Sequence, residues 1–118
     1  MSNPSKQKGT AFETLVATYL REVFPSVERA PAQGSHDRGD IFGVPGFTVE
    51  CKNRRDLAAG LAEGVDQAVA ESVNAGTSWS VAVVKRPRRG EPGDQYAVMP
   101  LWQFRQIAYA LSEGASWT

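Results

Sequence analysis

The sequence predicts a single α/β domain in which a mixed β-sheet is flanked by helices. Residues 47–52 alternate between apolar and polar side chains, as in a strand with one buried face. Residues 79–84 are almost continuously apolar, which is typical of a strand covered on both faces. A helical pattern lies between them, and a helix that links two strands favours a sheet with helices packed on its faces. The predicted order is αβββαββα.

The first half of the chain is expected to contain one helix and three strands. Apolar residues recur on one helical face over residues 9–23, and Pro25 ends this pattern. Turn-forming residues over 31–39 indicate a loop, and Pro45-Gly46 indicates a tight turn. The strands are expected at residues 27–30, 40–44 and 47–52.

The second half is expected to contain helix, strand, strand and helix. Asp56 is the expected N-cap of the first of these helices and Gly76 its end. Gly60 and Gly64 should weaken this helix by about 1 kcal/mol each relative to alanine. Its buried face is expected to comprise Leu57, Leu61, Val65, Ala68, Val69 and Ser72. Strands are expected at residues 79–84 and 95–99, and Pro100 opens a last helix that runs through Leu111.

Length and composition bound the organisation of the protein. The 118 residues suffice for one domain with a buried core, expected at residues 9–113, with tails at 1–8 and 114–118. The start of the chain lacks the apolar segment of a signal peptide, and no apolar run approaches the roughly 20 residues of a membrane span. A single cysteine excludes an internal disulfide. We therefore expect a cytoplasmic protein without a membrane partner.

A carboxylate and an amine share the polar face of the strand over residues 47–52. Glu50 and Lys52 lie roughly 6.5–7 Å apart along such a strand, and Asp40 opens the preceding one. Acids on two adjacent strands can bind one divalent cation, and a nearby lysine can stabilise charge on a phosphoryl group. Because the chain has one cysteine and one histidine, the expected ion is hard and held by oxygen: Mg²⁺, with Mn²⁺ as a substitute.

Two further residues near this strand have competing interpretations. Glu13 lies about 90° round the first helix from the centre of its apolar face, so it could lean toward the metal or simply be solvated. Cys51 points away from Glu50 and is expected to be a core residue rather than a nucleophile. Glu50 and Lys52 themselves would form an ordinary solvated pair if Asp40 did not accompany them.

Asp40 followed by Glu50-Cys51-Lys52 resembles the PD-(D/E)XK nuclease motif, with Gly39 in the place of its proline. Asp37 is the alternative for the motif aspartate, and Asp40 is preferred because it opens the apolar strand. An acid in the first helix, Glu13, and the serine-bearing segment 29–35 resemble archaeal-type Holliday junction resolvases, and the resemblance covers about residues 9–84.

This resemblance implies a restriction-endonuclease-like fold. It implies Mg²⁺ bound by Asp40 and Glu50, with Glu13 and the carbonyl oxygen of Cys51 as further candidate ligands, and a catalytic Lys52. The implied activity is a Mg²⁺-dependent endodeoxyribonuclease, most simply a Holliday junction resolvase acting on four-way or other branched DNA in a bacterial cell or a phage-infected host. The alternatives are a restriction-type, repair-type or RNA-directed nuclease of the same fold, and an inactive nucleic-acid-binding module.

Basic residues in loops around this motif predict contacts with nucleic acid. The net charge is zero, from 13 basic and 13 acidic residues, so these contacts depend on local grouping and not on total charge. Purely solubilising charge is the alternative. The expected contacts are Arg29, Ser35, His36, Arg38, Arg54, Arg55, Lys85, Arg86, Arg88 and Arg89.

Symmetric cleavage of a four-way junction needs two active sites, so we expect a two-fold homodimer. The last helix is the expected interface, with Trp102 and Phe104 as its apolar contacts. Gln67, on the helix after the Glu50 strand, is expected to be exposed because it lies opposite the predicted apolar face.

Overall fold

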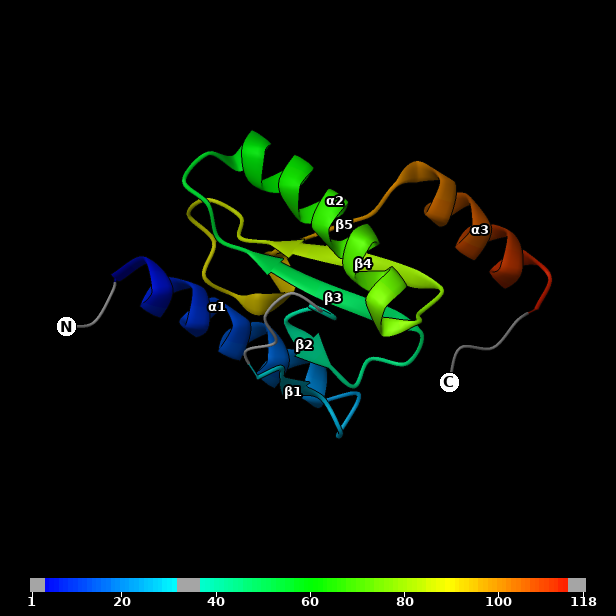
Figure 1. Cartoon of the computed structure of the whole chain (residues 1–118), viewed down its shortest axis with the longest axis horizontal. Coiled ribbons are helices and arrows are strands. Elements are labelled where there is room, and N and C mark those ends of the chain that lie inside the picture. The colour runs from blue at the N-terminus through cyan, green and yellow to red at the C-terminus, as the bar shows by residue number, and fades with distance from the viewer. Residues whose placement is uncertain (1–3, 32–36, 115–118) are drawn as a thin grey trace.

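The computed structural model describes residues 4–31 and 37–114, with the side chain of Ser5 excepted (Figure 1). These residues form an α/β domain in which a five-stranded mixed sheet carries the strand order β1-β2-β3-β4-β5. The elements follow one another as α1, β1, β2, β3, α2, β4, β5 and α3, so the predicted order is confirmed. A short 3-10 helix, η2, at Pro92–Asp94 precedes β5.

The centre of the sheet is the parallel pair β3 and β4, and the other neighbouring strands are antiparallel. Its register places Glu50 beside Ala82 and Lys52 beside Val84. The strands predicted at 47–52 and 79–84 are confirmed, and the outer strands are shorter than expected. The bounds are β1 Glu28–Arg29, β2 Ile41–Phe42, β3 Phe47–Lys52, β4 Trp79–Val84 and β5 Tyr96–Val98.

Helix α1, Pro4–Arg21, covers one face of the sheet. It begins before residue 9, so residues 4–8 belong to the helix and not to a tail. Proline is tolerated in the first turn because the N–H it lacks would have no partner there. Apolar residues of α1 pack against the face of β3 that carries Val49 and Cys51. The buried cluster is Phe12, Val16, Ala17, Val27, Ile41, Val49 and Cys51.

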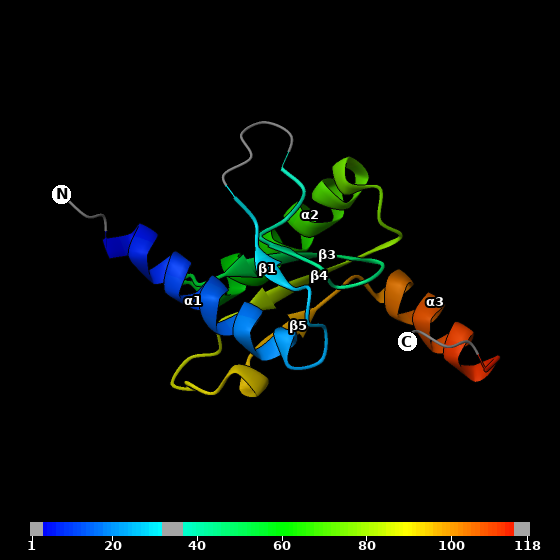
Figure 2. The ribbon, with the colours of Figure 1, turned by 90° about the horizontal axis from the view of Figure 1, so that it is seen from below.

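Helix α2, Leu57–Ala75, covers the opposite face, as the two perpendicular views show (Figures 1 and 2). The predicted caps are confirmed: the Asp56 side chain accepts the Ala59 N–H at 3.1 Å, and Gly76 has a φ of 71°. The predicted buried face is only partly right: Ala68 is buried, but the other predicted residues are half-buried because α2 is rotated relative to that expectation. Its buried residues are Gly60, Gly64, Ala68 and Glu71.

Gly64 explains this rotation. A Cβ at Gly64 would lie 3.1 Å from both the Ala82 Cβ and the Lys52 Cγ, which is closer than ordinary packing. The helix therefore approaches the sheet through its glycines, and the larger apolar side chains lie to either side. A side chain at Gly64 would obstruct this contact, whereas a Cβ at Gly60 would meet mainly the exposed side chain of Arg54.

Helix α3, Leu101–Ser112, projects from the end of the sheet (Figure 2). In this fully described helix only Gln103 is buried. Strand β5 pairs with β4 only from Ala82 onward, so the outer edge of Ser80 has no neighbouring strand. The Gln103 side chain takes the place of a neighbouring strand there. Its Oε1 accepts the Ser80 N–H at 2.9 Å, and its Nε2 donates to the Ser80 carbonyl at 2.7 Å. Within the described part of the chain, every helix is too short or too polar to cross a membrane.

Candidate functional site

Asp40 is held at the end of β2 by backbone contacts with β3. Its N–H donates to the Val49 carbonyl at 2.8 Å, and its Oδ2 accepts the Cys51 N–H at 2.8 Å. The preceding Gly39 has a φ of 103°, and a Cβ there would lie 2.9 Å from the Val49 carbonyl oxygen. Proline, whose φ is near −65°, cannot adopt this conformation. Glycine therefore brings the Asp40 carboxylate against β3, beside Glu50.

Glu50 is buried on the face of β3 that α2 covers, with 5% of its surface exposed. Its Oε2 has no hydrogen-bond partner among the described residues. Burial, with hydrogen bonds to Glu71 and Asp40, raises the pKa of Glu50 to about 11. Without a cation the Glu50 carboxyl is therefore neutral at pH 7, since a lone buried carboxylate is too costly to keep charged.

Glu71 on α2 completes the buried cluster. It is 9% exposed, and its Oε2 also lacks a partner in the described part of the chain. Carboxylate oxygens of Asp37, Glu50 and Glu71 lie within 4.8 Å of one another, so these three residues could hold a metal ion. Burial raises the pKa of Glu71, and its hydrogen bond to Glu50 offsets part of this effect. Asn74, one helical turn along, donates to the Asp37 carbonyl at 2.9 Å and ties that loop to α2.

Glu71 was not among the site residues predicted from the sequence. Gln67, on the same helix, is exposed, as predicted. The available signal was the spacing of Gly60, Gly64, Ala68 and Glu71, which places all four on one side of a helix. Small residues along that side indicate close packing on the sheet, and a glutamate at its end must then be buried.

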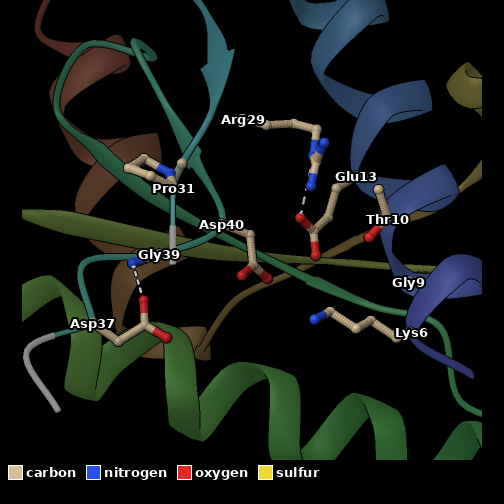
Figure 3. A pocket seen from close by; sticks show the side chains of 10 residues that line it. Lys6, Gly9, Thr10, Glu13, Arg29, Pro31, Asp37, Gly39 and Asp40 are labelled. Atoms are coloured by element: carbon tan, nitrogen blue, oxygen red, sulfur yellow. Dashed lines mark hydrogen bonds and ion pairs between the residues drawn. The ribbon is translucent and has the colours of Figure 1, made fainter. Parts of the chain in front are cut away.

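A cavity of about 360 Å³ opens beside this cluster, between α1 and the loop before β2 (Figure 3). Glu13 lies on this cavity, and its Oε1 is 3.5 Å from the Nε of Arg29. Burial and the nearby Asp40 charge raise the pKa of Glu13, which outweighs the opposing effect of Arg29. Lys6 extends from α1 into the same cavity (Figure 3). The lining residues are Lys6, Gly9, Thr10, Glu13, Arg29, Ala30, Pro31, Asp37, Gly39 and Asp40.

The two residues after Glu50 point to opposite faces of the sheet. Lys52 shares the face of Glu50 and is half-buried, with its side chain against Gly64 of α2. The Cys51 side chain is buried in the core beneath α1, as predicted, and burial raises the pKa of its thiol. A buried thiol with a raised pKa is typical of a core cysteine rather than of a nucleophile. The Cys51 carbonyl oxygen as a metal ligand stays a prediction.

The predicted nucleic-acid contacts do not form one surface. Arg29 pairs with Glu13 at the acidic cavity, and Arg38 lines a different cavity beside Thr77. Ser35 and His36 lie outside the described residues. The remaining contacts gather around the loop after β4: Arg54, Arg55, Lys85, Arg86, Arg88 and Arg89.

Part of this basic loop is held by its own neighbours. The Arg86 guanidinium lies 5.3 Å from the centre of the Tyr96 ring, and Arg89 forms a 3.8 Å ion pair with Asp94. Arg88 has a φ of 61°, in the left-handed region.

In comparisons with known proteins, no family model matches this chain, and no curated protein or solved structure matches it at a significant level. Fold and site alone define the class of this protein: an α/β domain with a buried carboxyl cluster beside an open cavity.

Proposed function

We propose that this protein is a metal-dependent endonuclease with a restriction-endonuclease-like fold, which hydrolyses DNA phosphodiester bonds. The observation that carries the proposal is the carboxyl cluster of Asp37, Glu50 and Glu71, whose oxygens lie within 4.8 Å of one another and in which one buried oxygen each of Glu50 and Glu71, Oε2, has no hydrogen-bond donor among the described residues. Buried polar atoms without partners are rare in native proteins, and each requires an explanation such as an ion. A divalent cation would supply the missing partner for both.

The donor set fits a hard cation. Every candidate side-chain ligand is a carboxylate oxygen, which Mg²⁺ and Mn²⁺ prefer, and the neighbouring cavity leaves room for water ligands. When bound, such an ion neutralises a phosphate and activates water for attack. Glu71 would hold it from α2, Glu50 from β3 and Asp37 from the loop before β2, and Asp40 would add a ligand from the cavity side. Glu13 is a further candidate across the cavity.

The chain's own residues supply the remaining roles. The Cys51 N–H fixes one oxygen of Asp40, so its carboxylate is positioned before any ligand arrives. Glu50 would have to release its proton to hold a cation, because only the carboxylate is a ligand. Lys52, on the same face of β3, would stabilise negative charge on the phosphoryl oxygens.

Branched DNA is the proposed substrate, with the protein acting as a Holliday junction resolvase. The support is the motif formed by Asp40 and Glu50-x-Lys52, together with basic loops near it. A domain of this size would recognise the phosphate backbone and the shape of the junction rather than base edges. Two-fold symmetric cleavage would then require a homodimer.

The test is cleavage of a labelled four-way junction and of a linear duplex with the same sequence, in Mg²⁺, Mn²⁺ or EDTA. We expect junction cleavage with either metal and none in EDTA. Glu50→Gln and Lys52→Met should each lower the cleavage rate by about 10²-fold or more, with junction binding retained. Glu22→Gln, an exposed glutamate on the turn after α1, is the matched control and should cleave normally.

Three outcomes separate the alternatives. Absence of cleavage with both metals, with binding intact, favours the inactive binding module. Equal cleavage of junction and linear duplex retains the nuclease and removes the junction preference. Cleavage of an RNA version alone identifies an RNA-directed enzyme.

A further inference from the structure

A second cavity, of about 280 Å³, lies where the parallel strands β3 and β4 end. The chain leaves both strands at this edge, and the Lys85 N–H donates to the Lys52 carbonyl at 2.9 Å. The lining residues are Lys8, Asn53, Arg54, Arg55, Lys85 and Pro87. Among these described residues four are cationic and none is acidic, whereas the cavity at Glu13 and Asp40 combines three acidic residues with two basic ones.

The Lys85 side chain is held by two backbone carbonyls of the same loop. It donates to the backbone carbonyls of Arg86 at 2.7 Å and Arg89 at 2.5 Å, which are neutral acceptors. Arg54 pairs with Glu63 on α2, but both side chains are nearly half exposed, so water screens their attraction. The cavity is therefore positively charged, with one fixed ammonium and exposed guanidinium groups around it.

Gln95 holds the loop that positions Lys85. Its Oε1 accepts the Arg86 N–H at 2.7 Å. Its Nε2 donates to the carbonyls of Arg89 at 3.0 Å and Glu91 at 2.7 Å. Both carbonyls that receive the Lys85 ammonium belong to residues fixed in this way. The charge is thus held in place before a ligand binds, which lowers the entropic cost of binding.

The distance between the two cavities suits a nucleic-acid strand. Asn53 follows Glu50 by three residues, which is roughly 10 Å along a strand. One strand of duplex DNA carries a phosphate about every 3.4 Å of helix axis. One strand could therefore contact both sites, with one phosphate beside Glu50 and another a short way along the backbone at the basic cavity.

We propose that the cavity lined by Lys8, Arg54, Arg55 and Lys85 binds a backbone phosphate of the same DNA strand that is cleaved beside Glu50. This inference rests on the proposed nuclease function. It assigns these cations to positioning of the strand, whereas the carboxyl cluster performs the chemistry.

The test measures the salt dependence of DNA binding in EDTA, where no cleavage occurs. Fluorescence anisotropy of a labelled four-way junction gives the dissociation constant at several salt concentrations. Each phosphate contact contributes about 0.9 to the slope of log affinity against log salt. Lys85→Met and Arg55→Gln should each lower the magnitude of this slope by about that amount. Arg105→Gln, an exposed residue on α3, is the matched control and should leave it unchanged.

The two variants have different structural risks. Lys85→Met removes two hydrogen bonds within the loop, whereas Arg55 is exposed, so its substitution leaves the fold intact. Wild-type slopes in both variants would overturn the proposed phosphate site and leave the nuclease proposal standing. If the wild-type protein itself binds no DNA, or binds it without salt dependence, both proposals fail.

Discussion

Glu50 shows how far the environment of one residue can depart from what its place in a strand suggests. The alternation over residues 47–52 correctly places it on the face opposite Val49 and Cys51. The polar face of a strand usually faces water. Here α2 covers the polar face of β3, and the carboxyl group of Glu71 on α2 lies close to that of Glu50. Two carboxyls in a buried site cannot both ionise without a counter-charge. The pair must therefore keep a proton, unless a cation supplies the counter-charge that its position would allow.

The first prediction concerns the pH dependence of stability without metal. The folded-state pKa of Glu50 is raised to about 11, above its value of 4.5 in the unfolded chain, and the pKa values of Glu13 and Glu71 are also raised. Between pH 4.5 and about pH 11 the folded state therefore binds more protons than the unfolded state. The stabilisation that the protonated Glu50 carboxyl provides is complete below pH 4.5. As pH rises above that value, the free energy of unfolding falls by up to about 1.4 kcal/mol per pH unit for one group.

Urea unfolding in EDTA at pH 6 and pH 8.5 measures this effect. We expect a lower free energy of unfolding at pH 8.5 in the wild type. Glu50→Gln cannot ionise, so its difference between the two pH values should be smaller. A wild-type protein that becomes more stable on going to pH 8.5 would contradict the buried neutral carboxyl.

The second prediction concerns Glu71 as a metal ligand. Mg²⁺ should raise the melting temperature, and the increase should be larger at pH 8.5 than at pH 6 because the cation competes with protons for the same oxygens. Glu71→Gln should reduce this increase. Asp66→Asn, an exposed acid on the same helix, is the control and should keep it. An undiminished Mg²⁺ effect in Glu71→Gln would exclude Glu71 from the metal site.

At the scale of the element, α2 is defined by how closely it approaches the sheet. Its caps at Asp56 and Gly76 follow from local chemistry and were predicted correctly. Its orientation about its own axis was not, because Leu57, Leu61 and Val65 are only half-buried while Gly60 and Gly64 face the strands. Close contact along the glycines brings Glu71 down onto β3, so the packing of this helix forms the carboxyl cluster.

The third prediction contrasts two helical glycines. In Gly64→Ala the new methyl group would lie 3.1 Å from the Ala82 Cβ, which belongs to a central strand and cannot easily move. We expect destabilisation of about 1–3 kcal/mol, typical of overpacking, despite the better helix propensity of alanine. Gly9→Ala in α1 meets nothing within 4 Å and should stabilise the protein by up to about 1 kcal/mol.

Chemical denaturation of both variants at one pH measures the contrast. Equal stabilisation by both substitutions would show that α2 does not approach the sheet as closely as described. Because the methyl group at residue 64 would also lie 3.1 Å from the Lys52 Cγ, Gly64→Ala should lower cleavage as well.

At the scale of the whole molecule, the sheet separates two faces with different chemistry. The face beneath α1 is an apolar core, and the face beneath α2 carries Glu50 and Lys52. Helix α3 is attached to the sheet mainly by Gln103, whose side chain forms hydrogen bonds with the backbone N–H and carbonyl of Ser80. It leaves large apolar side chains exposed: Leu101, Trp102, Phe104, Tyr109 and Leu111.

The fourth prediction is that these side chains form the interface of the proposed homodimer. The wild-type protein should sediment at twice the mass of the chain, and Phe104→Glu should convert it to a monomer. Val73→Glu, at a residue of α2 that is 79% exposed, is the control and should remain dimeric. A monomeric wild-type protein at micromolar concentration would contradict the dimer and, with it, symmetric cleavage of a junction by this chain alone.

By itself the sequence determined the order of the elements, the two central strands, the caps of α2 and the polar face that holds Glu50 and Lys52. These features depend on alternation, helical spacing and turn residues, all of which act between near neighbours in the chain. The candidate residues Asp40 and Glu13 do line one cavity beside Glu50, but their roles are still predictions.

Only the tertiary structure decided which face of α2 is buried, and therefore that Glu71 and Asp37 meet Glu50. It also separated Arg29, paired with Glu13, from the cations around Lys85. The physical reason is that helix rotation depends on the shapes of both packed surfaces, which come from distant parts of the chain. The pKa of a carboxyl group likewise depends on which parts of the chain bury it, and these cannot be predicted from the residues next to it in the sequence.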